Sequence, residues 1–87
     1  MLKIQRKANG DIVLTLSGRL QADNVSELAA LLAAEPPGRA LVLDLKDVVL
    51  VDRDIVRFLR AREGDGIALR NCPAYIREWI AREAEQP

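Results

Sequence analysis

The sequence predicts an α/β domain in which an N-terminal hairpin leads into a small, largely parallel sheet with helices packed on it. Short runs of β-branched and leucine residues alternate with segments whose apolar residues recur at helical spacing, and turns containing glycine or proline separate them. The predicted order is β-β-α-β-α-β-α within a single domain of residues 1–87, whose core spans about residues 4–80. A chain of 87 residues buries only about 60–65% of its unfolded surface, so we expect one modest core.

The hairpin is predicted from two alternating runs on either side of a turn. Residues 2–7 alternate apolar with basic or polar side chains, which suits an edge strand, and residues 11–17 place their largest apolar side chains on one face. Between these runs, Asn9 and Gly10 are expected to supply the positive φ angles of a tight turn. Gly18 is expected to end the second strand.

The first helix is predicted to begin at Asp23 or Asn24 and to run to about Ala34. Asn24 and Glu27 have the spacing of a capping box, and the apolar residues that follow recur on one side of the helix. Residues 36–38, Pro-Pro-Gly, end the helix because proline lacks an amide donor and restricts the residue before it.

The central segment, residues 41–59, is predicted to form a strand, a loop and a helix. Residues 40–45 make an apolar run too short for a typical buried helix and suited to a strand covered on both faces. Asp52 is the expected N-cap of the helix, with its carboxylate accepting a hydrogen bond from the amide of Asp54 or Ile55. We call residues 52–55 the elbow; functional sites of open α/β sheets tend to lie at such strand-to-helix junctions.

The C-terminal part is predicted to contain a turn at residues 63–66, a short strand at 67–70 and a helix that opens at Pro73. The expected buried stripe of this helix consists of Tyr75, Ile76, Trp79 and Ile80. Glu83 is expected on the exposed face of the same helix.

The central segment resembles the STAS domain family, the module of anti-sigma-factor antagonists and sulphate transporters. Residues 44–45 are similar to the Asp-Leu pair that ends the family's central strand, and residues 49–52 are similar to the approach to its helix. After the Asp of its motif the family has two hydroxyl residues and a glycine, whereas this chain has Arg53, Asp54 and Ile55. The order of elements from about residue 4 to residue 80 also resembles the STAS fold.

The resemblance implies a non-enzymatic domain, similar to an anti-sigma-factor antagonist, that binds an anti-sigma kinase or a related regulator and so frees a sigma factor. In the family, the partner kinase phosphorylates a hydroxyl near the helix start to break the complex. The serines and threonines here are Thr15, Ser17 and Ser26, and none lies in the elbow. Asp54 takes the place of the second hydroxyl, but a carboxylate carries about −1 charge against roughly −1.5 to −2 for a phosphate. The alternative is that Asp52 and Asp54 merely stabilise the helix start.

The predicted partner-binding surface consists of Asp52, Arg53, Asp54, Ile55, Arg57 and Arg60. Its three arginines recur at i, i+4 and i+7 and form what we call the arginine stripe, which is either a solvated face or a docking face for an acidic partner. Two further functions are left open. One is that of a constitutive STAS-like subunit of a stress-signalling scaffold or lipid-transport assembly. The other is the binding of a small anion through the elbow amides.

Composition disfavours several other classes of function. Lys plus Arg and Asp plus Glu both number 13, so the net charge is zero and a nucleic-acid partner is not expected. The chain has no histidine and no phosphate-binding glycine loop, so neither an enzyme nor a cofactor is expected. The spacing of Asp44, Asp47, Asp52 and Asp54 argues against a magnesium site, and Asp44 is expected to be a structural acid.

The lone cysteine and the apolar runs indicate the compartment. Cys72 excludes an internal disulfide and fits a reducing environment; it is expected to be an inert, half-buried residue, with a reactive thiolate as the alternative because it lies at a helix start. No run of about 18 apolar residues and no signal-peptide core is present, so we expect a soluble cytoplasmic protein without membrane insertion.

Overall fold

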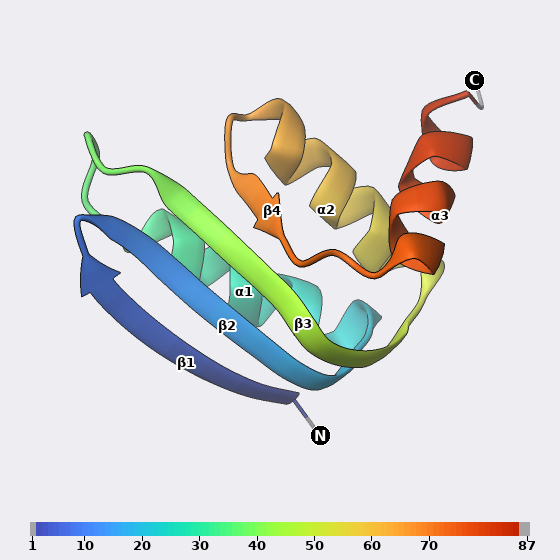
Figure 1. Cartoon of the computed structure of the whole chain (residues 1–87), viewed down its shortest axis with the longest axis horizontal. Helices are drawn as coiled ribbons and strands as arrows, with labels where there is room; N and C mark the ends of the chain where they lie inside the picture. Colours follow the sequence, from blue (N-terminus) through green and yellow to red (C-terminus); the bar gives the residue numbers. More distant parts are fainter. Residues whose placement is uncertain (1, 86–87) are drawn as a thin grey trace.

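The computed structural model describes residues 2–85 and confirms the predicted order of elements. They are β1 (Leu2–Asn9), β2 (Asp11–Leu20), the 3₁₀ turn η1 (Ala22–Asn24), α1 (Val25–Ala33), β3 (Leu41–Val51), α2 (Arg53–Gly64), β4 (Ala68–Arg70) and α3 (Ala74–Ala84) (Figure 1).

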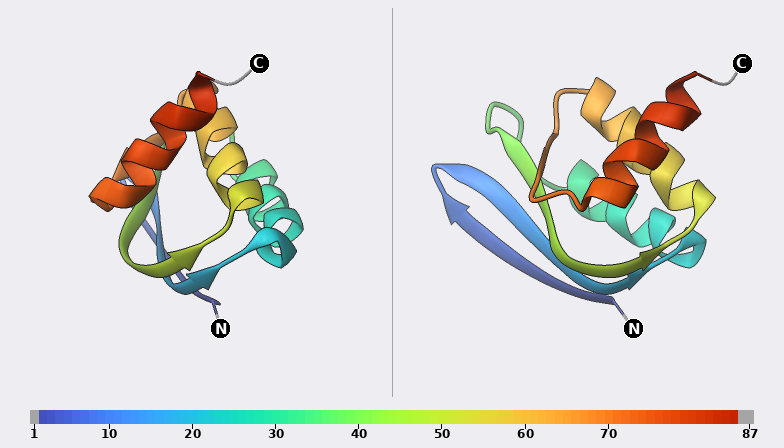
Figure 2. Two further views of the ribbon diagram at one scale, coloured as in Figure 1. Left: turned by 90° about the vertical axis from the view of Figure 1, so that its right-hand side faces the viewer. Right: turned by 45° about the vertical axis from the view of Figure 1, so that its right-hand side comes forward.

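The four strands form one mixed sheet in the order β1-β2-β3-β4. β1 is antiparallel to β2, and the other neighbours are parallel, as predicted. Consecutive parallel strands are almost always joined by right-handed crossovers, so α1 and α2 belong on the same face of the sheet. Figure 2 shows α1 and α2 on that side, with α3 crossing α2.

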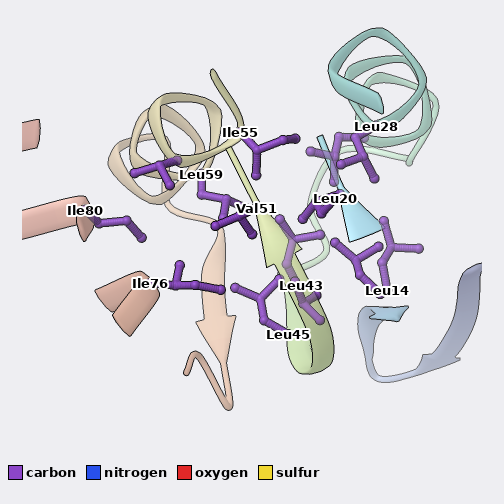
Figure 3. Close-up of a cluster of buried hydrophobic side chains, with 14 residues drawn as sticks. Leu14, Leu20, Leu28, Leu43, Leu45, Val51, Ile55, Leu59, Ile76 and Ile80 are labelled. Atoms are coloured by element: carbon purple, nitrogen blue, oxygen red, sulfur yellow. The ribbon is translucent and has the colours of Figure 1, made fainter. Parts of the chain in front are cut away.

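A single apolar core joins the sheet to all three helices. Side chains from β2, β3, α1, α2 and α3 meet in one cluster (Figure 3). The predicted inward face of β2 is confirmed, because Ile12, Leu14 and Leu16 are buried. Val42 and Leu43 point to opposite faces of β3 and are both buried, as expected for a strand covered on both faces.

One ion pair ties the edge strand to the end of α1. The Arg6 guanidinium donates from Nε to Oε2 of Glu35 at 2.9 Å and from Nη2 to Oε1 at 2.9 Å. This pair holds the pKa of the Glu35 carboxyl below its ordinary value, chiefly through the hydrogen bond from Arg6.

The prediction that Gly18 ends the second strand is wrong. β2 continues to Leu20, and Gly18 adopts a φ of +96° where the register against β3 is irregular. Glycine accepts this conformation without steric cost, so a bulge absorbs it and the strand goes on. Because β2 is longer, β3 also keeps ladder partners as far as Val51, and the predicted loop between strand and helix is replaced by strand.

Two of the predicted turn and cap details also differ. At the hairpin turn Gly10 has a φ of +87°, whereas the sole non-glycine residue with positive φ within residues 2–85 is Asn71, so Asn9 does not share the turn's positive φ. The predicted capping box of Asn24 with Glu27 is wrong. Instead, Asn24 Oδ1 accepts a hydrogen bond from the amide of Gln21 at 2.9 Å, so the box closes around η1, one turn earlier.

The predicted buried stripe of α3 is partly right. Ile76 and Ile80 are buried and Trp79 is partly buried against the core. Tyr75, however, is 46% exposed although its neighbour Ile76 is buried, because successive side chains of a helix point about 100° apart.

Candidate functional site

Asp52 forms the elbow, and both of its carboxylate oxygens are engaged. Its extended backbone caps α2, and Oδ1 accepts a hydrogen bond from the Ile55 amide at 3.0 Å, one of the two partners predicted. Oδ2 accepts a hydrogen bond from the amide of Ala22 at 2.8 Å. Local sequence patterns do not indicate this second bond, because Ala22 lies 30 residues away in η1. The elbow is therefore bonded to the start of the first helical segment.

The other predicted surface residues divide between core and solvent. Ile55 is completely buried, so it supports the elbow from within and offers no contact area to a partner. Asp54 is exposed in the first turn of α2, and Arg57 and Arg60 are exposed further along the helix. The structure thus places the arginine stripe on the outer side of α2, opposite the buried residues Ile55, Val56 and Leu59.

The prediction that Glu83 is exposed is wrong. Glu83 is buried and forms ion pairs with two residues of the predicted partner-binding surface. Only 7% of its side chain is exposed. Arg53 Nε donates a hydrogen bond to Glu83 Oε1 at 2.8 Å, and Arg57 Nε lies 3.8 Å from Oε2. Glu83 lies seven residues after Ile76 and three after Ile80, so the helical period places it on the buried side of α3, and only its charge suggested exposure. Because α3 crosses α2, this side meets the arginines.

The arginines determine the ionisation of Glu83. The hydrogen bond from Arg53 is the main cause that holds the pKa of the Glu83 carboxyl below its ordinary value, with weaker contributions from the charge of Arg57 and from the Trp79 indole. The ionised carboxylate in turn fixes two arginine side chains that are each more than half exposed. The first two turns of α2 are therefore linked to the last turn of α3 by charge.

A hollow of about 550 Å³ lies between α2 and α3 beside this ion pair. Arg53, Trp79, Arg82 and Glu83 line it. The lining combines two cations, one carboxylate and one aromatic ring. Sequence reasoning did not identify this hollow, since it forms only where the two helices cross.

Two exposed apolar residues precede the elbow. Val49 is 71% exposed and Leu50 is 44% exposed, although both lie within β3. The family resemblance drew attention to this stretch, but nothing in the sequence indicated that its side chains face water. Apolar area, arginines and an acidic cap therefore lie side by side along the chain at the junction of β3 and α2.

The remaining candidate groups have structural environments. Asp44 accepts hydrogen bonds from the Lys46 amide at 3.0 Å and from Asn71 Nδ2 at 3.3 Å, as expected of a structural acid. Burial raises the pKa of the Cys72 thiol, which opposes formation of a reactive thiolate. Within residues 2–85, no group of three His, Cys, Asp or Glu side chains is placed to hold a metal ion.

None of the helices within residues 2–85 is long and apolar enough to cross a membrane. The arrangement at the junction of β3 and α2 consists of cations, carboxylates engaged as caps or ion pairs, and exposed apolar side chains. Such a combination suits recognition of another surface, because arginine and apolar residues are enriched in the centres of protein interfaces.

Comparison with known proteins connects this fold to a family. The chain matches the family model described as "Mlab, STAS domain" over residues 4–82. No curated protein matches it. Among solved structures it is similar to an uncharacterized protein of the DUF3478 family with a SpoIIAA-like fold from Shewanella loihica PV-4, with 15% identity and a TM-score of 0.57 over 95% of this chain and 75% of that one.

It is also similar to the crystal structure of Mglu, with 23% identity and a TM-score of 0.53 over 83% of this chain. The match covers 19% of the Mglu chain, so this protein spans about a fifth of that length. At these identities both likenesses concern the fold alone.

Proposed function

The chain belongs to the STAS domain family, as its resemblance predicted, and from this membership we propose that residues 1–87 act as one protein-interaction domain that binds its partner through the elbow and the outer side of α2. The observation that supports this site is the junction of β3 with α2. There, exposed Val49 and Leu50 lead into a helix whose outer side carries the arginine stripe. Arginine is over-represented among the residues that contribute most to binding, and apolar side chains around such residues exclude water from the interface.

By analogy with the family, the partner is an anti-sigma kinase or a related regulator, and the domain acts in the cytoplasm by competition. While it occupies the regulator, the sigma factor is free. The elbow carries Asp54 where the family has a hydroxyl, so the partner kinase has no acceptor at that place and the complex is not broken by phosphorylation. Catalysis by this chain is not part of the proposal, and the choice of partner rests on analogy, since fold does not fix function.

One observation favours a second function, that of a constitutive subunit of a larger assembly such as a stress-signalling scaffold or a lipid-transport complex. Asp52 uses both oxygens to bond the elbow to α2 and η1, and Glu83 holds Arg53 and Arg57 in place. These hydrogen bonds and ion pairs hold the surface in one conformation. The first turn of α2 also has no hydroxyl that a kinase would modify, so such a surface is suited to permanent docking.

Affinity capture from source-cell lysate with ATP tests both functions. The baits are the native chain, Asp54→Ser and Arg57→Glu, with Arg39→Glu as the matched control for charge reversal. Arg39 is exposed and precedes β3, whereas the elbow follows it, so the 11 residues of the strand separate the two positions.

We expect Arg57→Glu to lose the partner and Arg39→Glu to retain it, with both variants folded by circular dichroism. A kinase-like regulator that phosphorylates Asp54→Ser alone supports the antagonist function. Assembly subunits recovered equally with the native chain and Asp54→Ser support the second function. Equal recovery with Arg57→Glu and the native chain would refute the elbow interface.

A further inference from the structure

The hollow between α2 and α3 has a lining whose charges do not cancel. Glu83 is the one carboxylate of the lining, and Arg53 hydrogen-bonds it while Arg57 approaches it from outside. Arg82 also lines the hollow but forms no ion pair with any other residue in the range 2–85. The lining therefore offers an arginine fork that the carboxylates of residues 2–85 leave unmatched.

Trp79 gives the hollow an apolar wall. Trp79 and Glu83 are four residues apart on α3, so their side chains lie one above the other on the same side of the helix, with Arg82 next to them. Trp79 is partly buried and packs its ring against the core, which fixes the wall in place.

We propose that this hollow receives an acidic side chain from an extended segment of the protein partner, with the carboxylate on Arg82 and the methylene groups against Trp79. The inference rests on the proposed function and names the chemistry that the partner contributes next to the elbow. Arginine binds a carboxylate through two parallel N–H···O bonds, a geometry that a planar fork and a single acidic group share. The volume of about 550 Å³ accommodates such a side chain and its neighbours.

The lining favours a singly charged carboxylate over a phosphate. Two arginines and one carboxylate give it a net charge of 2 − 1 = +1, which a single carboxylate neutralises, whereas a dianionic phosphate leaves an excess negative charge beside Glu83. Desolvation also favours the carboxylate, because the cost of removing an ion from water rises with the square of its charge, whereas its attraction to the lining rises only in proportion. A glutamate or aspartate side chain is thus the better-matched occupant than a phosphorylated group or a lipid headgroup.

The single tryptophan of the chain makes the hollow directly observable. Trp79 gives one indole N–H resonance and a fluorescence signal that reports on this wall alone. The probe is a blocked peptide with one central glutamate flanked by leucines, titrated into the full chain. The same peptide with glutamine and inorganic phosphate at equal ionic strength are the comparison ligands. The variants are Arg82→Gln and, as a matched control on an exposed arginine, Arg39→Gln.

We expect the glutamate peptide to shift the Trp79 indole resonance saturably, the glutamine peptide to bind about tenfold more weakly, and Arg82→Gln to weaken the glutamate peptide by about the same factor. Arg39→Gln should bind as the native chain does. An equal effect of phosphate, an equal effect of the glutamine peptide, or no saturable shift overturns the proposal.

The outcome also separates this proposal from the elbow interface. If the glutamate peptide fails while Arg57→Glu still abolishes partner capture, the hollow is refuted and the proposed function stands. If the peptide binds at Arg82 while Arg57→Glu retains the partner, the hollow is supported and the elbow interface is wrong.

Discussion

The two halves of β3 belong to one strand but differ in how much of each is buried. The first half lies between β2 and β4, and its residues Leu43 and Leu45 are completely buried. β4 pairs only as far as Asp44, and β2 alone accompanies the second half, where Val49 and Leu50 face water. The first half is therefore buried on both faces, whereas the second half buries Val48 and Val51 and exposes Val49 and Leu50.

The same division continues into α2. Its inner side contributes Ile55, Val56 and Leu59 to the core, whereas its outer side carries the arginine stripe. Asp52 stands between the two regions, because its carboxylate is bonded to the backbone on both sides of the junction. Variants on either side of Asp52 should consequently separate stability from binding.

The largest effect is expected in the first half of β3. Leu43→Ala removes a completely buried side chain and should lower the free energy of unfolding by about 2–5 kcal/mol, measured by urea denaturation. Leu50→Ala, the same change in the second half, should lower it by no more than about 0.5 kcal/mol. Similar losses of unfolding free energy at the two positions would show that the two halves of β3 do not differ in their contribution to stability.

The junction itself should give an intermediate effect. Asp52→Ala removes the N-cap of α2, which costs about 0.5–2 kcal/mol, and leaves the Ala22 amide without its acceptor, which adds about 1 kcal/mol or more. Asp54→Ala is the matched control, since it loses only a helix-dipole interaction of about 0.3–1 kcal/mol. The measurement is again urea denaturation. An Asp52 variant no less stable than the Asp54 variant would show that the two bonds contribute little.

The second half should respond in binding more than in stability. Val49→Lys places a charge on an exposed strand position and should change the free energy of unfolding by less than about 1 kcal/mol. It should weaken binding of the captured partner about tenfold by isothermal titration, because it removes apolar contact beside the arginine stripe. Lys7→Ala on the edge strand is a control for surface changes remote from the elbow, because Lys7 is in register, through Val13, with Val42 at the start of β3. Unchanged affinity of Val49→Lys would exclude this half of β3 from the interface.

Sequence alone predicted the features that depend on local patterns. The alternation in β2, the helical spacing in α2 and the N-cap at Asp52 are properties of neighbouring residues, and the structure confirms each of them. The extension of β2 past Gly18 was missed because a glycine with positive φ is compatible with a strand end or with a bulge, and the register against β3 decides between them.

The candidate site was less predictable because its contacts join distant segments. Ile55 was assigned to the surface from the family motif, although its place on the apolar side of α2 puts it in the core. Glu83 was assigned to solvent because of its charge, although its spacing from Ile76 and Ile80 puts it on the buried side of α3. Its partner Arg53 lies 30 residues away, and only the crossing of α3 over α2 brings the two together. The bond from Ala22 to Asp52 likewise spans 30 residues. Helical and strand periods contain no information on such pairs.

The smallest expected effect concerns the ion pair that joins α3 to the outer side of α2. The arginines hold the pKa of Glu83 below its ordinary value of 4.5, so the native state binds fewer protons than the unfolded state in this range. The stabilisation is therefore fully present above about pH 4.5 and is lost as the pH falls through the lowered folded pKa. It is modest, because Arg53 and Arg57 are more than half exposed and water screens their charges.

Glu83→Gln isolates this contribution from the other acids. Glu35 also has a lowered pKa, so acid destabilises the native chain through both carboxylates, but only the difference between the native chain and Glu83→Gln reports on Glu83. Urea denaturation at about pH 6 and about pH 3 should show that difference shrinking towards zero at the lower pH. A difference that stays constant would mean that the two arginines do not stabilise the charged form of Glu83. In that case, apolar packing alone would fix α2 against α3, as it fixes the first half of β3, and the ion pair would contribute nothing.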